Sequence, residues 1–68
     1  MRARKLPPPM ARRALRVASG LTLQDIAADL GVTRSAVHRW EKGSRTPTGE
    51  LRVRYADVLR QLASGVAE

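Results

Sequence analysis

The sequence predicts a compact all-α fold of four to five helices, and three features of the chain support that prediction. Apolar residues recur at intervals of three and four, which places them on one face of a helix. Threonines suited to capping helices precede several of these segments, and glycines follow them. No segment alternates apolar and polar residues as a half-buried strand does. A chain of 68 residues without cysteine must therefore form one small domain around an aliphatic core, with no disulfide to stabilise it.

Three regions are expected along the chain. Residues 1–8 are predicted to be a flexible basic N-terminal arm, because consecutive prolines favour extended backbone. Residues 9–63 are predicted to form the folded domain. Residues 64–68 are predicted to be a frayed C-terminus, as is common at the ends of small domains.

The first helix is expected to begin at Pro8 or Pro9, since proline is tolerated in the first helical turn. Gly20 is suited to its C-terminal cap. Three arginines, Arg12, Arg13 and Arg16, are expected at the polar positions of this helix. Its predicted apolar face consists of Met10, Ala14, Leu15, Val17, Ala18 and Leu21.

Two short helices with a three-residue turn between them follow. Thr22 and Asp25 have the spacing of a capping box, which predicts the start of the first short helix. Gly31 is expected to end it in left-handed backbone, where glycine carries no steric penalty. Thr33 is predicted to cap the second short helix, and Gly43 to end it. Two helices joined by a short glycine-containing turn form a helix-turn-helix unit.

The apolar positions of the last three helices predict the core. The last helix is expected to start at Thr48 and to extend to about Leu62, with one apolar stripe along it. Ala27 is small where the two short helices cross closely. The predicted core positions of these helices are Leu23, Ile26, Ala27, Leu30, Ala36, Val37, Trp40, Leu51, Tyr55, Val58, Leu59 and Leu62.

The charge of the chain points to a polyanionic partner. Thirteen Lys and Arg residues oppose six acidic residues, which gives a formal net charge of +7. Several of these cations fall on the side of the second short helix that is opposite Val37 and Trp40. Arginine can donate two hydrogen bonds to the major-groove edge of guanine. The alternative for each of these residues is a solvated side chain on an amphipathic helix.

The segment 21–47 reads LTLQDIAADLGVTRSAVHRWEKGSRTP, and it resembles the lambda-repressor-like (Cro/XRE) helix-turn-helix family. The likeness extends to Arg16 on one side and to Ala56 and Leu59 on the other. The resemblance implies a lambda-repressor-like fold and a regulator of transcription that binds double-stranded DNA. It also implies that the helix of about 33–42 enters the major groove.

The resemblance further implies roles for individual residues. Its base-reading positions correspond to Arg34, Ser35 and Arg39. His38 lies one turn from Arg34 and is included with them, with plain solvation as its alternative. The positions expected to contact phosphates are Thr33 at the helix start, together with Lys42, Ser44 and Arg45 at the helix end and in the loop that follows it.

Two further positions are compared with the family. The family pairs a glutamate of the third helix with an arginine of the first, which implies a structural ion pair between Glu41 and Arg16. Leu23 stands where the family often has a glutamine that holds a DNA phosphate. Gln24 follows at a different helical azimuth, so the resemblance does not carry that phosphate contact over to this chain.

The basic residues of the arm, Arg2, Arg4 and Lys5, are possible DNA contacts. They would wrap around the duplex or enter an adjacent minor groove, as homeodomain arms do. A tail that does not bind is the other interpretation. Because one helix reads only a few base pairs, specific binding is expected to need a homodimer on a pseudo-palindromic site. The last helix and residues 63–66 are the candidate dimer surface by elimination.

The sequence argues against several other classes of protein. With one histidine and no cysteine, neither a metal site nor a catalytic triad is expected, so we predict no enzyme activity and no cofactor. No apolar stretch approaches the roughly 20 residues of a membrane span. No secretory signal is evident, which favours a cytoplasmic, nucleoid-associated protein. No small-molecule effector is expected.

Two alternative functions remain open. The first is an architectural DNA-binding factor of a phage or mobile element, similar to an excisionase, which would bind at an attachment site. The second is an antitoxin-like module that docks on a protein partner. Strong binding to a co-encoded protein, without salt-dependent DNA affinity, would favour the second.

Overall fold

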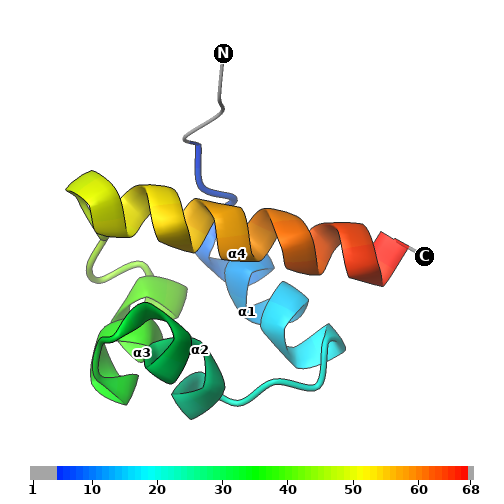
Figure 1. Ribbon diagram of the computed structural model, residues 1–68, viewed down its shortest axis with the longest axis horizontal. Coiled ribbons are helices and arrows are strands. Elements are labelled where there is room, and N and C mark those ends of the chain that lie inside the picture. Colours follow the sequence, from blue (N-terminus) through cyan, green and yellow to red (C-terminus); the bar gives the residue numbers. More distant parts are fainter. Residues whose placement is uncertain (1–4, 68) are drawn as a thin grey trace.

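The structure is a computed structural model that describes residues 5–67. In this part of the chain there are four helices and no strand, which confirms the all-α prediction. α4 lies across α1 and also contacts α2, while α3 packs against both α1 and α2 (Figure 1). The four helices are α1 (Pro9–Ala18), α2 (Leu23–Leu30), α3 (Arg34–Lys42) and α4 (Gly49–Ala67).

The predicted caps of the helix-turn-helix are present. The backbone N–H of Thr22 donates to Asp25 Oδ2 at 2.8 Å, and the N–H of Asp25 donates to Thr22 Oγ1 at 3.0 Å. The bond from the Thr22 backbone lowers the pKa of Asp25, because it stabilises the carboxylate. Thr33 Oγ1 accepts the N–H of Ala36 at 3.1 Å. Gly31 adopts left-handed backbone with φ +71°, so the chain turns sharply between α2 and α3.

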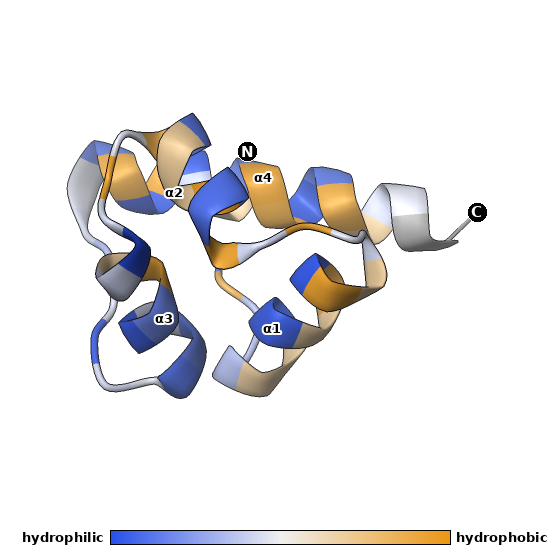
Figure 2. Ribbon diagram, turned by 90° about the horizontal axis from the view of Figure 1, so that it is seen from below, coloured by the Kyte–Doolittle hydropathy of each residue, from blue (hydrophilic) through white to orange (hydrophobic). Residues whose placement is uncertain are grey.

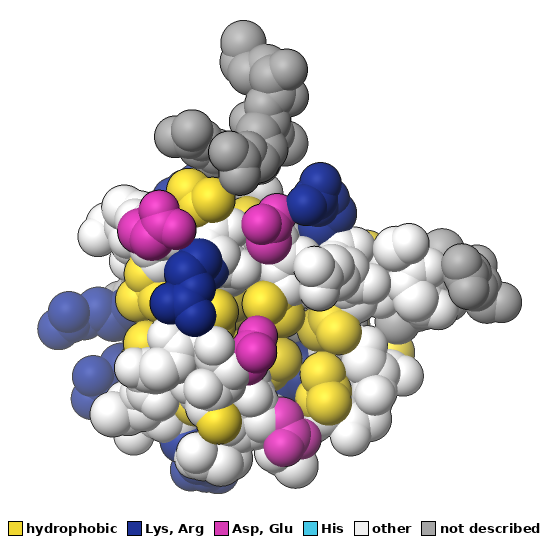
Figure 3. Space-filling view, viewed as in Figure 1, with side chains coloured by type: hydrophobic (Ala, Val, Ile, Leu, Met, Phe, Trp, Pro, Cys, Tyr) yellow, Lys and Arg dark blue, Asp and Glu magenta, His cyan; other side chains and the backbone are white. Residues whose placement is uncertain are grey.

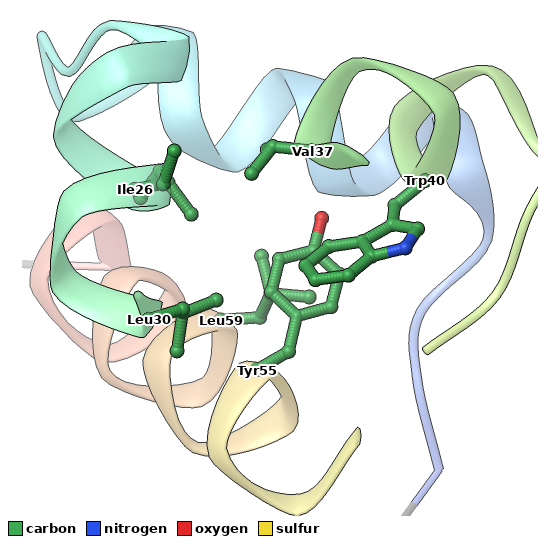
Figure 4. Close-up of a cluster of buried hydrophobic side chains, with 7 residues drawn as sticks. Ile26, Leu30, Val37, Trp40, Tyr55 and Leu59 are labelled. Atoms are coloured by element: carbon green, nitrogen blue, oxygen red, sulfur yellow. The ribbon is translucent and has the colours of Figure 1, made fainter. Parts of the chain in front are cut away.

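The core lies between α2, α3 and α4, at the positions that the sequence predicts. Ala27 and Val37 are fully buried where the two motif helices cross. The rings of Trp40 on α3 and Tyr55 on α4 pack with centroids 4.7 Å apart at 46° (Figure 4). Tilted aromatic pairs of this kind stabilise a core beyond the area they bury. The buried apolar residues are Ile26, Ala27, Leu30, Val37, Trp40, Tyr55 and Leu59.

The predicted apolar face of the first helix is wrong for four of its six residues, whereas Leu15 and Leu21 do pack against the core. Met10 is 85% exposed and Val17 is 52% exposed, and Ala14 and Ala18 also face solvent. Only Leu15, half-buried on this helix, packs against the core. The physical reason is that α1 turns Arg12 and Arg16 toward α3, which supplies an acceptor for each, and the opposite side of the helix is thereby left in solvent.

The last helix is longer than expected, and the segment before the first helix contacts the rest of the fold. α4 continues to Ala67 instead of ending near Leu62, because no proline interrupts it and each added residue extends an existing helix at little cost. At the other end, residues 5–8 have no regular structure but contact the helical body. Leu6 packs against the core, and the Pro7 carbonyl accepts a hydrogen bond from α1.

Candidate nucleic-acid interface

The outer side of α3 carries polar and cationic residues only. Val37 and Trp40 point into the core, where they are at most 5% exposed. α3 and the loop after it are largely hydrophilic in Figure 2. The helix therefore presents a polar side whose orientation is fixed by its buried side. The exposed residues on it are Arg34, Ser35, His38, Arg39 and Lys42, which include all four predicted base-reading positions.

The start of α3 is a capped helix N-terminus. Thr33 lies outside the helix as its N-cap and is exposed. Its hydroxyl oxygen accepts the Ala36 N–H, so the hydroxyl proton points elsewhere and can be donated to a phosphate oxygen. The remaining N–H groups of the first turn and the positive end of the helix dipole also favour an anion there.

The loop after α3 caps the end of the helix. It also brings Arg39, a predicted base-reading residue, close to Arg45, a predicted phosphate contact. The backbone N–H of Ser44 donates to the Arg39 carbonyl at 3.1 Å, and its hydroxyl donates to the same oxygen at 3.4 Å. Arg45 is exposed. Arg39 and Arg45 lie on one shallow hollow of about 220 Å³. The other residues that line it are Ala36, Trp40, Thr46, Pro47, Thr48 and Leu51.

The cations of this surface are not neutralised by neighbouring carboxylates. Two ion pairs of the described residues lie elsewhere: Arg16–Glu41 on the inner side of α3 and Arg60–Asp57 on α4. No described residue forms an ion pair with Arg34, Arg39, Lys42 or Arg45. Their charges are therefore available to a polyanion.

The inner side of α3 contains the Arg16–Glu41 pair that the family resemblance implies. Arg16 Nε donates to Glu41 Oε2 at 2.6 Å and Nη2 donates to Oε1 at 3.0 Å, a two-bond geometry that strengthens the pair. Arg16 Nη1 also donates to the Leu21 carbonyl at 2.9 Å. The hydrogen bonds to Glu41 raise the pKa of Arg16. The pair joins α1 to the last turn of α3.

Arg12 is a residue of this region that the sequence analysis missed. It is 7% exposed, with Nε donating to the Pro7 carbonyl at 2.7 Å and Nη1 donating to the Trp40 carbonyl at 2.9 Å. Arginine is seldom buried, so its placement on the polar side of α1 was the natural expectation. One signal was available: Arg12 lies four residues before Arg16, and therefore on the same face of the helix.

The hydroxyl of Tyr55 lies within the same buried region. Tyr55 is 1% exposed, and its hydroxyl has no hydrogen-bond partner among the described residues. Burial is the main cause that raises its pKa to about 12, and the negative charge of Glu41 adds to this, while Arg12 and Arg16 act in the opposite direction. Three charged groups, Glu41, Arg12 and Arg16, thus act on the hydroxyl of one core side chain.

The described part of the N-terminal arm lies beside α4. Lys5 and Pro7 line a hollow of about 250 Å³ whose other wall includes Asp57 and Arg60 of α4. The other two predicted arm contacts, Arg2 and Arg4, lie outside the described residues.

The position of Leu23 agrees with the departure from the family pattern. Its side chain is half-buried and packs against the core, whereas Gln24 beside it is exposed.

Among residues 5–67, no helix is both long and apolar enough to cross a bilayer. Over the same range, no three histidine or acidic side chains gather as a metal site would require.

Comparison with known proteins identifies one family. The helix-turn-helix family model HTH_3 matches residues 13–62, which is most of the chain. The matched range contains all of α2 and α3, the Arg16–Glu41 pair and the loop with Arg45. No curated protein and no solved structure gives a significant match.

Proposed function

Because the chain belongs to the Cro/XRE helix-turn-helix family of DNA-binding transcription regulators, we propose that it is a repressor that binds a specific sequence in double-stranded DNA. One observation carries the proposal. The outer side of α3 presents cations that have no described carboxylate partner, on a helix whose inner side is fully buried. A rigid cationic helix of this kind suits the major groove, which admits one α-helix.

The bases are read by the exposed residues of α3. Arg34 and Arg39 each have the donors to hold guanine O6 and N7, a contact that contributes about 1–3 kcal/mol of discrimination against a wrong base. Ser35 and His38 lie on the same side of the helix and contact neighbouring base edges.

Phosphate contacts fix the register of the helix in the groove. Thr33 binds a phosphate at the start of α3 through its hydroxyl, and Lys42, Ser44 and Arg45 bind the backbone near its end. Such contacts orient a protein on the duplex but carry no sequence information directly. Lys5, with Arg2 and Arg4, adds backbone or minor-groove contacts from the N-terminal arm.

Binding in the cell requires two copies of the chain on a pseudo-palindromic site. Specific interfaces with DNA bury roughly 1,000–2,500 Å² of protein surface, which is a large share of the 4670 Å² exposed here. α4 is the proposed dimer element, since Val58 and Leu62 on it are only half-buried. Hydrophobic side chains gather on the face where α4 lies beside α1 and α2 (Figure 3).

We also propose that this polypeptide works without a small-molecule effector. The two hollows described above measure about 220 and 250 Å³. Both lie below the ~300–1,000 Å³ of typical ligand pockets. Regulation would then act on the amount of protein or on its assembly. As a DNA-binding protein, it would act in the cytoplasm, where the DNA lies.

Selection from a pool of random duplexes tests the proposal. We expect a consensus of two inverted half-sites whose centres lie about one helical turn, or 10 base pairs, apart. Affinity for the selected duplex should fall steeply as salt is raised, because bound phosphates release counterions. A pool that yields no consensus would overturn sequence-specific binding. Occupancy of an attachment site in place of a promoter would instead indicate the architectural role.

A further inference from the structure

Arg12 is a buried arginine whose charge is satisfied without a carboxylate. It is buried, and both of its hydrogen-bond acceptors are backbone carbonyls, from Pro7 and Trp40. A buried charge without partners is strongly unfavourable, so these two bonds must hold the guanidinium in one place. The acceptors belong to separate parts of the fold, since Pro7 precedes α1 and Trp40 lies in the last turn of α3.

The hydrogen bond from Arg12 to the Trp40 carbonyl acts on the C-terminal end of α3. This carbonyl lies where the helix dipole is negative and a cation is favoured. Arg16, one turn further along α1, holds the side chain of Glu41, the next residue of α3. Arg12 therefore restrains the backbone of α3, and Arg16 restrains a side chain beside it. Together they limit both the displacement and the rotation of this end of the helix.

The start of α1 also abuts the end of α3 directly. A Cβ placed on Gly43 would lie 3.1 Å from Cγ of Pro9, so the two segments are in close contact. Arg12 thus joins three elements at one point, namely segment 5–8, the start of α1 and the end of α3. The last turn of α3 bears Arg39 and Lys42, which face outward.

We infer that Arg12 is a positioning residue for DNA reading. It holds the C-terminal turn of α3, and with it Arg39, at one orientation relative to α1 and to segment 5–8. This inference rests on the proposed function, because it assigns Arg12 to the discrimination between base sequences. The planar guanidinium is required, since lysine keeps the charge but cannot place two donors in a fixed fork.

The substitution Arg12→Lys tests the inference against Arg13→Lys as its matched control. Both variants keep the net charge, and Arg13 is exposed on the same helix. For each, the affinity for the selected duplex is divided by the affinity for a scrambled duplex of equal length. Partial unfolding lowers both affinities by the same factor, so this ratio does not respond to stability alone.

We expect Arg12→Lys to lower the ratio about tenfold, the order of the loss caused by one mismatched base pair. Its salt dependence should stay close to that of the wild type, because the number of cations that can contact phosphates is unchanged. Arg13→Lys should keep the wild-type ratio. An unchanged ratio for Arg12→Lys would overturn the inference. A wild-type ratio near one would instead defeat the proposed function itself, and the inference with it.

A measurement on the wild type covers the case in which Arg12→Lys does not fold. Hydrogen exchange of the arginine Nε–H groups is followed by NMR in the free protein and in its complex with the selected duplex. We expect the Arg12 Nε–H to exchange far more slowly than that of Arg13 in both states. Equal exchange rates would show that the Arg12 anchor does not persist in solution and would overturn the inference.

Discussion

The helices α1 and α3 have opposite distributions of polar and apolar residues. α3 follows the usual amphipathic pattern, with Val37 and Trp40 inside and its cations outside. α1 turns Arg12 toward the interior and leaves Met10 and Val17 in solvent. The two helices nevertheless pack against each other.

The difference shows that the inner side of α1 is matched to α3 by hydrogen bonds as much as by apolar contact. α3 offers a carboxylate on Glu41 and a backbone carbonyl on Trp40, and α1 supplies an arginine for each. The packing of α3 against α1 therefore depends on polar groups. Polar contacts require defined directions, so they orient α3 more narrowly than apolar contacts would.

The largest expected effect is the loss of the Arg16–Glu41 pair. Glu41→Ala should lower the free energy of unfolding by about 3–5 kcal/mol, since it leaves the largely buried side chain of Arg16 without its carboxylate. A chain of this size holds only roughly 3–10 kcal/mol, so the melting temperature should fall sharply. Arg60→Ala is the control, because it breaks an exposed pair that contributes about 0–1 kcal/mol. Equal melting temperatures for the two variants would show that the inner pair does not stabilise the fold.

A smaller effect is expected where α3 ends against α1. Gly43→Ala forces a side chain into left-handed backbone at φ +80° and into close contact with Pro9. Gly20→Ala meets the same backbone penalty at φ +74° but has open space around its Cβ. We expect Gly20→Ala to cost about 1–2 kcal/mol, the usual left-handed penalty. Denaturant unfolding should show a greater loss for Gly43→Ala, and the reverse order would contradict the close packing of these two helices.

The next effect concerns Tyr55 and depends on pH. Its pKa is raised to about 12, mainly because burial disfavours the ionised form, so the stability of the fold is unaffected below about pH 10 and falls as the pH rises from there toward 12. Tyr55→Phe should remove that alkaline loss. At neutral pH the substitution should be close to neutral, because the buried hydroxyl has no described partner to lose. Thermal melts of both proteins from pH 8 to 12 measure this, and parallel curves would contradict it.

The smallest effect is expected on the outer side of α1. Met10→Gln and Val17→Gln replace exposed apolar side chains, so each should change the free energy of unfolding by no more than about 0.5 kcal/mol. Leu15→Gln, on the inner side of the same helix, should be clearly destabilising. Chemical denaturation of the three variants compares the two sides directly. A large loss from Met10→Gln in the isolated protein would show that the outer side is packed in solution.

The sequence predicted α2, α3 and their turn well, because local signals determine them. Thr22, Gly31 and Thr33 act within a few residues of their own positions, and Val37 and Trp40 follow the helical period. The orientation of α1 was not predictable in this way. Arg12 is buried because of a carbonyl 28 residues away, and only tertiary structure brings the two together. The Arg16–Glu41 pair is a long-range contact that was predicted, because the family resemblance supplied the information that local sequence lacks.

The most direct test of DNA reading by α3 compares Arg39→Ala with Arg45→Ala. Affinities are measured for the selected duplex and for versions that carry every single-base change in one half-site. We predict that Arg39→Ala loses the preference at one or two adjacent positions, worth about 1–3 kcal/mol, and keeps the others. Arg45→Ala should weaken binding to all duplexes alike and reduce the salt dependence by about one phosphate. Uniform weakening by Arg39→Ala would contradict the assignment of α3 as the reading helix.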